Sequence, residues 1–320
     1  MNIEQLARDR AELKARWRRE GWFKDETIAE AILRAARERP DIPYYFSTED
    51  GLRRSASGEI AEQGRQLGAA FGALGIGPGD VVALQLPARY ETAIMYVAAF
   101  CAGATLLPIV HLYGSSEVAF ILRKARAKAL IVPERWRHID YLERIEDLDD
   151  QPDLEHIIVL GERAPPRCQL FRDFIGRAEP DFAPRHTDPD SLGLLLFTSG
   201  TTGEPKGVMQ THNTVRCEWE KQFMTARGKF LNPSPAGHIQ GFNFLFRPMF
   251  SAVPMVMMDR WEPVRAAQLI EKLGVAQTGG APYFLMSLLE AARAHDLDIS
   301  GLTTFGLGVQ SRNLMVHHRS

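Results

Sequence analysis

The chain has 320 residues, 45% of them hydrophobic, and its 38 basic and 40 acidic residues leave a formal net charge of −2. Such a chain can bury one large or two ordinary cores, which excludes a disordered protein. The balanced charge lacks the basic excess of a general nucleic-acid binder, so we expect small-molecule partners and no nucleic acid.

Three cysteines, Cys101, Cys168 and Cys217, are widely spaced and form no Cys-x-x-Cys pair. This pattern predicts neither a disulfide framework nor a thiolate metal site, and it favours a reducing, cytoplasmic location. The first ten residues lack the apolar core of an export signal, and their acidic residues count against a mitochondrial transit peptide. We interpret them as a solvated helix.

From residue 60 onward, helical and strand patterns alternate. Ile60, Leu67, Phe71 and Leu74 share one helical face. The expected elements after it are a strand at 81–86, a helix from 91, a strand at 106–110, a helix to 126 capped by Ser115 or Ser116, and a strand at 129–132. The alternation predicts an α/β fold with doubly wound, mostly parallel sheets between helices.

The segment 93–110 carries no charge and is long enough to be considered as a membrane span. Gly103, Thr105 and Pro108 interrupt it. A helix of about ten residues followed by a buried strand explains the pattern better, so we expect no integral membrane segment.

A stretch rich in Pro and Asp at 181–191 has the composition of a linker. Strands are expected after it at 194–197 and 256–258, and helices at 263–273 and 283–294. We therefore predict an N-terminal α/β subdomain over residues 1–185, a second and incomplete α/β subdomain over 186–308, and a separate tail over 309–320.

The strand at 194–197 runs into a loop of hydroxyls, glycines and one lysine. Its binding candidates are Thr198, Ser199, Gly200, Thr201, Thr202, Gly203 and Lys206. Glycines let backbone N–H groups approach an anion, hydroxyls add neutral donors, and the lysine adds charge. This composition favours the phosphates of a nucleotide triphosphate, although a Ser/Thr/Gly-rich surface loop that binds nothing is the alternative.

The spacing argues against a Walker-type kinase or ATPase. Pro205 stands where a Walker A loop has its second glycine, and Gly207 follows Lys206 in place of Ser or Thr. Val208 and Met209 are expected to form a second short strand before a helix begins near 211–213. A Walker loop opens directly into a helix instead.

The string from Thr198 to Gly207 resembles the phosphate-binding loop of the AMP-forming adenylating enzymes, the superfamily of acyl- and aryl-CoA synthetases, luciferases and nonribosomal peptide adenylation domains. Segments 77–87 and 99–108 resemble two further segments of that family, and 206–213 is similar to short-chain, medium-chain and cyclohexanecarboxylate-type CoA ligases. The resemblance implies ATP, Mg²⁺ and coenzyme A, with a carboxylic acid activated as acyl-adenylate and transferred to the thiol.

Residues 234–242 resemble the family segment that lines the carboxylate and acyl pocket. The resemblance implies that His238, Gly241 and Phe242 border this pocket, although a lone histidine in an apolar setting is more often a packing residue. The aromatic residues that follow could line a hydrophobic tunnel, but aromatics at this density more often belong to a core.

The string at 279–282, Gly-Gly-Ala-Pro, is similar to an adenine-contacting element of the family, but it opens a helix and we do not assign it to adenine. The resemblance stops at Gly308. Relatives continue with an adenine-contacting turn, a glutamate that serves magnesium, a ribose-binding aspartate and a small C-terminal domain with a catalytic lysine. The resemblance therefore implies no complete catalytic set and no metal ligand in this chain.

We expect a truncated member of the ligase lineage with weak or absent activity alone, whose residues 309–320 are a frayed tail or follow a change of reading frame. His317 and His318 lack the spacing of a zinc site. The alternative is a non-catalytic nucleotide-binding remnant or an interaction module. The sequence identifies neither a partner polypeptide nor the acyl substrate, for which a fatty or alicyclic acid is expected.

Overall fold

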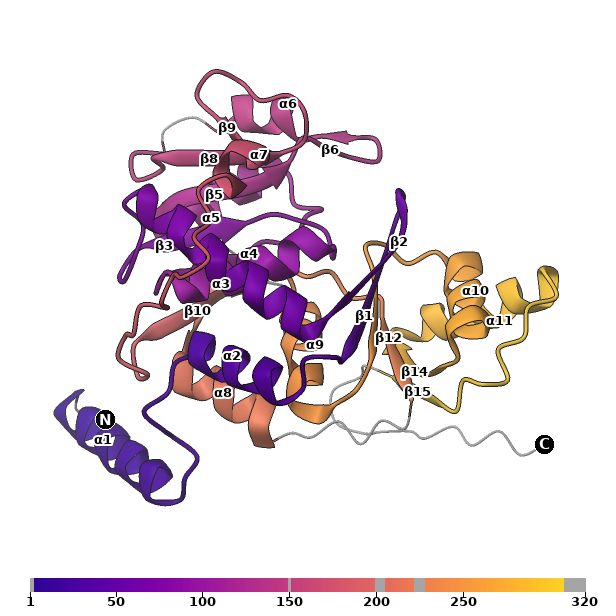
Figure 1. Ribbon diagram of the computed structural model, residues 1–320, viewed down its shortest axis with the longest axis horizontal. Helices are drawn as coiled ribbons and strands as arrows, with labels where there is room; N and C mark the ends of the chain where they lie inside the picture. Colours follow the sequence, from indigo (N-terminus) through magenta and orange to yellow (C-terminus); the bar gives the residue numbers. More distant parts are fainter. Residues whose placement is uncertain (1–2, 149–150, 199–204, 222–227, 308–320) are drawn as a thin grey trace.

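Buried apolar strands form two mostly parallel sheets in the computed structural model, which describes residues 3–148, 151–198, 205–221 and 228–307 (Figure 1). The seven-stranded sheet has the order β11-β10-β4-β3-β5-β8-β9, and every pair except β10 with β11 is parallel. Its strands are β3 (Val81–Leu84), β4 (Thr105–Pro108), β5 (Ala127–Pro133), β8 (His156–Leu160), β9 (Gln169–Leu170), β10 (Leu192–Thr198) and β11 (Lys206–Thr211).

The six-stranded sheet has the order β15-β14-β12-β13-β1-β2, and only β1 with β2 is antiparallel. Its strands are β1 (Pro43–Thr48), β2 (Gly51–Ala56), β12 (Lys229–Asn232), β13 (Met255–Met258), β14 (Val275–Gly280) and β15 (Thr304–Leu307). A hairpin of β6 (Arg135–Trp136) and β7 (Ile139–Asp140) stands apart from both. The predicted doubly wound α/β fold is confirmed.

Strand pairing crosses the boundary that we predicted at residue 185. β1 lies beside β13, with Tyr44 opposite Met255, and β10 lies beside β4, with Leu194 opposite Leu106. The early strands β1 and β2 thus complete the later sheet, and β10 and β11 complete the earlier one. Apolar strands that are buried on both faces can pair wherever the covering helices allow. Each sheet therefore contains strands from both sides of residue 185.

Helices cover the sheets, and their ends follow local signals. Thr27 and Glu30 form a capping box, and Gly274, with φ +63°, ends one helix. Gly114, not the predicted Ser115 or Ser116, is an N-cap. The helices are α1 (Ile3–Arg19), α2 (Ile28–Glu38), α3 (Ser57–Ala73), α4 (Tyr90–Cys101), α5 (Ser115–Ala125), α6 (Tyr141–Glu146), α7 (Phe171–Ile175), α8 (His212–Lys221), α9 (Ile239–Ser251), α10 (Pro263–Leu273) and α11 (Pro282–Ala294).

The uncharged segment 93–110 is divided between α4 and β4, as predicted, and Gly103 between them has φ +79°. Within the described ranges, no helix has both the length and the apolar character that crossing a bilayer demands.

An aromatic cluster joins α4, α8 and α9 between the two sheets. Its members are Tyr96, Phe100, Trp219, Phe242 and Phe246, all of them buried. The Trp219 and Phe246 ring centroids are 5.2 Å apart, and those of Tyr96 and Phe242 are 6.0 Å apart. Aromatic pairs at such distances stabilise a core beyond the area they bury. The cluster therefore holds the start of α9 against the seven-stranded sheet.

Two histidines are buried, and burial is the largest influence on the pKa of each. His212 lies between α2 and the 181–191 segment: its Nδ1 accepts a hydrogen bond from the Ile28 backbone N–H at 3.3 Å, and its Nε2 lies 3.2 Å from the Thr187 hydroxyl. The His111 ring packs edge-on against Trp136, with centroids 4.5 Å apart. Burial lowers the pKa of each histidine from 6.5 to about 4.

Replacing Phe242 by alanine is expected to lower the free energy of unfolding by about 3–5 kcal/mol, because a fully buried ring would leave a cavity. Urea unfolding monitored by circular dichroism measures the change. The matched control is Tyr283→Ala, whose ring is 66% exposed and whose loss should cost about 0.5 kcal/mol or less. Equal losses of unfolding free energy in the two variants would contradict the stabilising role of the aromatic cluster.

Acid is expected to destabilise the chain through His111 and His212. Each imidazole stays neutral in the fold down to about pH 4 but takes up a proton near pH 6.5 when unfolded, so stability falls as the pH drops below 6.5. Between pH 7 and pH 5 the loss is about 2 kcal/mol per histidine.

Urea unfolding at both pH values tests this effect. His212→Asn should reduce the difference in the free energy of unfolding between pH 7 and pH 5 by about 2 kcal/mol, whatever the substitution does to stability at pH 7. The exposed His295, substituted in the same way, should leave the difference unchanged. An unchanged difference in His212→Asn would contradict the neutral, buried imidazole.

Candidate functional site

The predicted phosphate loop connects β10 and β11, which form an antiparallel hairpin. Thr198 ends β10 directly opposite Lys206, which begins β11, and the Thr198 hydroxyl lies 3.5 Å from the Lys206 carbonyl oxygen. Both residues are exposed, whereas Leu195 and Leu196 of β10 are buried. The predicted second strand at Val208 and Met209 is confirmed, because α8 begins only at His212.

Five of the predicted phosphate-binding residues lie outside the described residues: Ser199, Gly200, Thr201, Thr202 and Gly203. Their role stays a prediction. The two ends of the loop, Thr198 and Lys206, are the part of the site that the structure places.

The hairpin opens at the edge of the seven-stranded sheet where the parallel strands have their carboxyl ends. β10 is the parallel neighbour of β4, so Thr198 and the residues after Pro108 lie at the same edge. Ligands of open α/β sheets bind at this edge.

A turn from the six-stranded sheet, residues 233–238, packs against the same edge. A Cβ added to Gly237 would lie 2.3 Å from the carbonyl carbon and oxygen of Ile109, just after β4, so only glycine permits the approach. The Tyr96 hydroxyl donates a 3.2 Å hydrogen bond to the Ala236 carbonyl in the same turn. The turn that precedes His238 is thus held at the strand next to β10.

His238 is the N-cap of α9. Its Nδ1 accepts a hydrogen bond from the Gln240 backbone N–H at 3.3 Å. Burial of part of the ring lowers its pKa, which keeps the imidazole neutral at pH 7. A neutral ring that accepts at Nδ1 must carry its proton on Nε2. Because the side chain reaches the surface, this N–H is available to a ligand oxygen.

The other two predicted pocket residues have packing roles. A Cβ on Gly241 would lie 1.9 Å from the Pro235 carbonyl oxygen, so the glycine lets the first turn of α9 close onto the turn before it. Phe242 is fully buried in the aromatic cluster. Phe244 is half-buried and stacks on Phe230 at 4.5 Å. The structure therefore places Phe242 in the core and not on an open tunnel.

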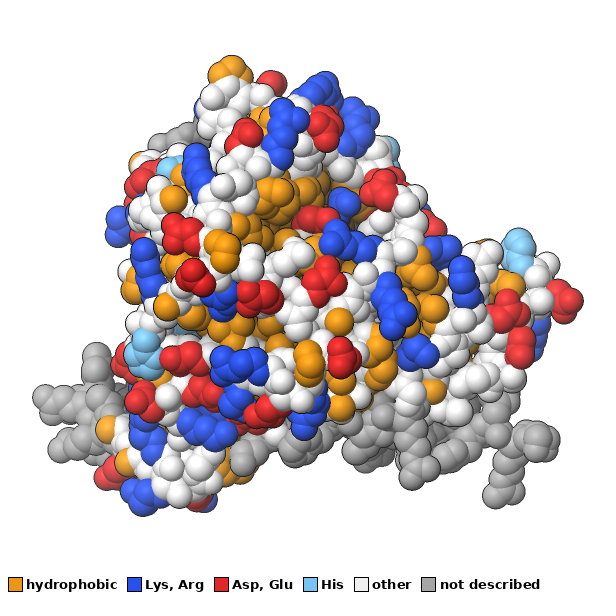
Figure 2. Space-filling view, viewed as in Figure 1, with side chains coloured by type: hydrophobic (Ala, Val, Ile, Leu, Met, Phe, Trp, Pro, Cys, Tyr) orange, Lys and Arg blue, Asp and Glu red, His pale blue; other side chains and the backbone are white. Residues whose placement is uncertain are grey.

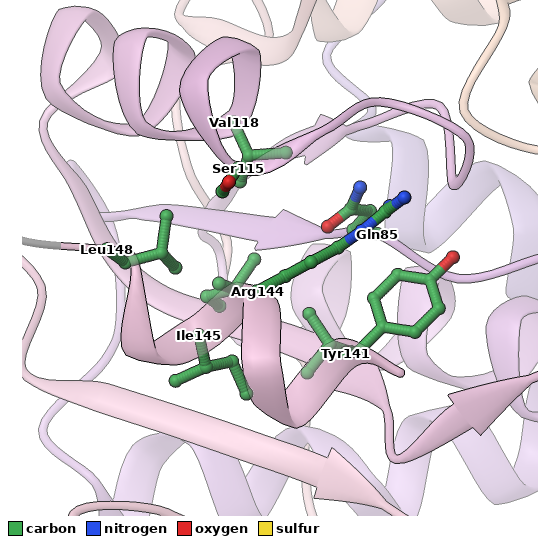
Figure 3. Close-up of a pocket in the computed structure, with 9 residues that line it drawn as sticks. Gln85, Ser115, Val118, Tyr141, Arg144, Ile145 and Leu148 are labelled. Carbon is green, nitrogen blue, oxygen red and sulfur yellow. The ribbon is translucent and has the colours of Figure 1, made fainter. Parts of the chain in front are cut away.

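Two cavities among the described residues lie away from the hairpin. One, at the carboxyl ends of β3 and β5, has a volume of about 10 Å³, which suits one water molecule. Figure 3 shows Gln85 and Arg144 side by side there, and both donate 2.8 Å hydrogen bonds to the Tyr113 carbonyl oxygen. A hollow of about 360 Å³ lies at the ends of β1 and β13, lined by charged residues that include Asp259 and Arg265. Neither contains a predicted site residue.

Metal ligands were not predicted within this chain. In the ranges that the structure describes, no group of three or more His, Cys, Asp or Glu side chains could hold a metal ion. The 279–282 string closes β14 and leads into α11, so the helix expected to follow it is confirmed.

Sequence reasoning missed the polar residues that anchor the hairpin at its base. Asn213 and Arg216, in the first turns of α8, are fully buried, and both contact the segment between α1 and α2. Polar and charged residues are seldom fully buried unless paired. The only signal in the sequence was their position just after β11, and their partners are about 190 residues away.

Comparison with known proteins gives one family. A family model described as AMP-binding enzyme matches residues 32–315. The chain is 28% identical over 311 residues to the medium-chain fatty-acid–CoA ligase of Escherichia coli, with 92% of this chain and 53% of that protein covered. It is 28% identical over 276 residues to a medium/long-chain-fatty-acid–CoA ligase of Mycobacterium tuberculosis, with 82% and 47% covered.

Solved structures share the fold. The apo structure of MbtA from Mycobacterium smegmatis superposes with a TM-score of 0.78 at 24% identity, covering 94% of this chain and 55% of that one. A fatty acyl CoA synthetase of Mycobacterium tuberculosis gives 0.76 at 21% identity, covering 89% and 55%. The chain spans about half the length of the curated relatives that it matches. The match over residues 32–315 shows that this chain belongs to the AMP-binding enzyme family.

Proposed function

We propose that this chain binds ATP at the β10–β11 hairpin and belongs to an AMP-forming acid–thiol ligase whose substrate is a fatty or alicyclic carboxylic acid. One observation carries the proposal: Thr198 and Lys206 face each other at the carboxyl edge of β10, and the turn before His238 packs on the neighbouring strand. The residues proposed to bind phosphate thus lie at the end of β10, and the histidine proposed to donate to the substrate carboxylate lies near the end of the neighbouring strand β4. The fatty-acid–CoA ligases among the relatives support the substrate class.

The proposed reaction has two displacements. A carboxylate oxygen attacks the α-phosphorus of ATP, the bond between that phosphorus and the α–β bridging oxygen breaks, and pyrophosphate leaves with the electron pair. The thiol sulfur of coenzyme A then attacks the acyl carbon of the acyl-adenylate and its proton passes to solvent, while the bond between the acyl carbon and the phosphate oxygen breaks and AMP leaves with the electron pair. Protein groups contribute by positioning the reactants and stabilising charge.

Each residue has a defined part in this proposal. The Lys206 ammonium binds the β- and γ-phosphates as a point charge, together with the hydroxyls of Thr198, Thr201 and Thr202. The Nε2–H of His238 donates to the substrate carboxylate at the N-terminus of α9, where the helix dipole also favours an anion. Within the described residues we assign no protein ligand to Mg²⁺, which in nucleotide sites is bound largely by substrate phosphates and water.

The location and the partners follow from the same proposal. The three cysteines are free in the structure, and their spacing favours the cytoplasm as the compartment. Acidic and basic side chains are interspersed on the face that Figure 2 shows, which favours small-molecule partners over nucleic acid.

Lys206→Ala is expected to raise the Kd for ATP about ten- to a hundredfold, since a hydrogen bond to a charged group contributes about 1.5–3 kcal/mol. Isothermal titration calorimetry on the full chain measures the effect. Lys124→Ala, which removes an exposed lysine on α5, is the matched control and should leave the Kd unchanged. ATP binding that is equally tight in both variants would contradict the proposed contact of Lys206 with the phosphates. ATP binding without adenylate formation would instead favour a non-catalytic nucleotide-binding chain.

His238→Asn is expected to weaken carboxylate binding about tenfold in the presence of ATP and to leave the Kd for ATP itself unchanged. Asparagine keeps the N-cap of α9, so the loss isolates the Nε2–H donor. Calorimetric titration with a medium-chain fatty acid provides the measurement, and His295→Asn is the exposed control. A parallel loss of ATP affinity would show that His238 supports the fold and not the acid.

A further inference from the structure

We propose that an N-terminal strap, residues 14–27, positions the phosphate-binding hairpin by holding its base, and that Asn213 and Arg216 are the positioning residues through which it acts. The inference rests on the proposed function of the hairpin. The strap comprises the end of α1 and the segment that leads to α2, and it precedes residues 32–315, which the family model matches. Figure 1 shows α1 outside the two sheets, near α2 and α8.

The strap contacts α8 through its own backbone. The Lys24 N–H donates a 2.9 Å hydrogen bond to Asn213 Oδ1, and Arg216 Nη2 donates one of 2.7 Å to the Trp22 carbonyl oxygen. Arg216 Nη2 also lies 2.9 Å from Asn213 Oδ1, which joins the two contacts. Both α8 side chains are fully buried. Asn213 Oδ1 and Arg216 Nη2 would therefore each lose a hydrogen-bond partner if the strap moved away.

Carboxylates balance the buried guanidinium. Glu220 Oε2 accepts from Arg216 Nη1 at 2.6 Å and from Lys24 Nζ at 2.8 Å, and Glu220 Oε1 accepts from Arg34 at 2.5 Å. Burial alone would raise the pKa of Glu220, but the hydrogen bond from Lys24 and the charges of Arg216 and Lys24 bring it below its usual value. Breaking such a network leaves a buried charge without its partner, which is costly.

A second set of contacts reaches the start of the hairpin. Asp190, two residues before β10, accepts from Arg18 Nη2 at 2.7 Å and from Asn213 Nδ2 at 2.9 Å, and its carboxylate lies 3.6 Å from Lys14 Nζ. The Asn213 backbone N–H donates to the Pro189 carbonyl at 2.9 Å. Asn213 follows β11 by two residues. The strap and Asn213 therefore tie both ends of the hairpin base together.

The geometry of the hairpin makes this base important. Among the described strands β11 is an edge strand that pairs with β10 alone, and its residues 206–209 are exposed. Lys206 lies about 17 Å along the strand from the base, so a tilt of about 5° there would move it by about 1.5 Å. Displacements of this size are enough to weaken a phosphate contact. By stiffening the base, the strap therefore keeps the Lys206 ammonium within contact distance of a bound phosphate.

The test uses point variants of the full chain. Lys14→Ala/Arg18→Ala removes the contacts of α1 with Asp190, and Lys24→Ala removes its ion pair with Glu220. Arg16→Ala is the matched control, because Arg16 pairs with Glu20 inside the strap. Two quantities are measured: the Kd for ATP by calorimetry, and the hydrogen–deuterium exchange of residues 206–211 without ligand.

We expect Lys14→Ala/Arg18→Ala to raise the Kd for ATP about three- to tenfold and to speed exchange in β11, with the melting temperature within about 2 °C of wild type, as is usual for exposed ion pairs. The conservative variant Arg18→Lys should keep the Kd for ATP and the exchange of β11 at their wild-type values. Arg16→Ala should change neither quantity. In a Lys206→Ala background the strap variant should lose most of its effect on the Kd, because the strap acts through that lysine.

Unchanged exchange and unchanged Kd in both strap variants would overturn the proposal, as would effects equal to those of Arg16→Ala or fully additive with Lys206→Ala. The exchange measurement separates this inference from the proposed function. If the wild-type chain binds no ATP, the proposed function fails. Even then, faster exchange of β11 in the strap variants but not in Arg16→Ala would show that the strap stabilises the hairpin. Unchanged exchange would refute the inference.

Discussion

The approach of Gly237 to the backbone of Ile109 is the contact that joins the two sheets at the candidate site. It requires a residue without a side chain, and the same holds for Gly241 against the Pro235 carbonyl oxygen. Together the two glycines bring the turn before α9 onto the end of β4, the strand beside β10. The position of His238 depends on this approach, and the ring contacts of the aromatic cluster pack α9 against α4 and α8.

The site is therefore composite, because neither sheet provides it alone. The seven-stranded sheet provides the hairpin with Thr198 and Lys206, and the six-stranded sheet provides the turn and the start of α9. The chain crosses between the sheets to achieve this arrangement. After β1 and β2 the chain enters the seven-stranded sheet, which β10 and β11 continue beyond the 181–191 segment, and β12 then begins in the six-stranded sheet. Polar contacts of Asn213 and Arg216 with the N-terminal strap hold the point where this crossing occurs.

Much of the fold could be predicted because its signals are local. Apolar runs near 81–86 and 129–132 gave strands, and the spacing around Lys206 gave a hairpin in place of a strand–helix junction. Pairing between strands far apart in sequence could not be predicted, because Tyr44 and Met255 meet only through tertiary packing. The same limit explains Phe242: the resemblance implied a pocket wall although aromatic residues at this density more often belong to a core, and its neighbours in the fold place it in the core. Of the candidate site, the roles of His238 and Lys206 stay predictions from the sequence, and the close approach of Gly237 to Ile109 was not predicted.

The most direct test of the account is a crystal structure of the full chain with a non-hydrolysable ATP analogue. We expect the triphosphate at the β10–β11 hairpin, with the β- and γ-phosphates within hydrogen-bond distance of Lys206 and the α-phosphate on the side of the turn that carries His238. A nucleotide bound elsewhere, such as in the charged hollow at the ends of β1 and β13, would contradict it, as would a well-ordered hairpin that leaves the nucleotide unbound at saturating concentration.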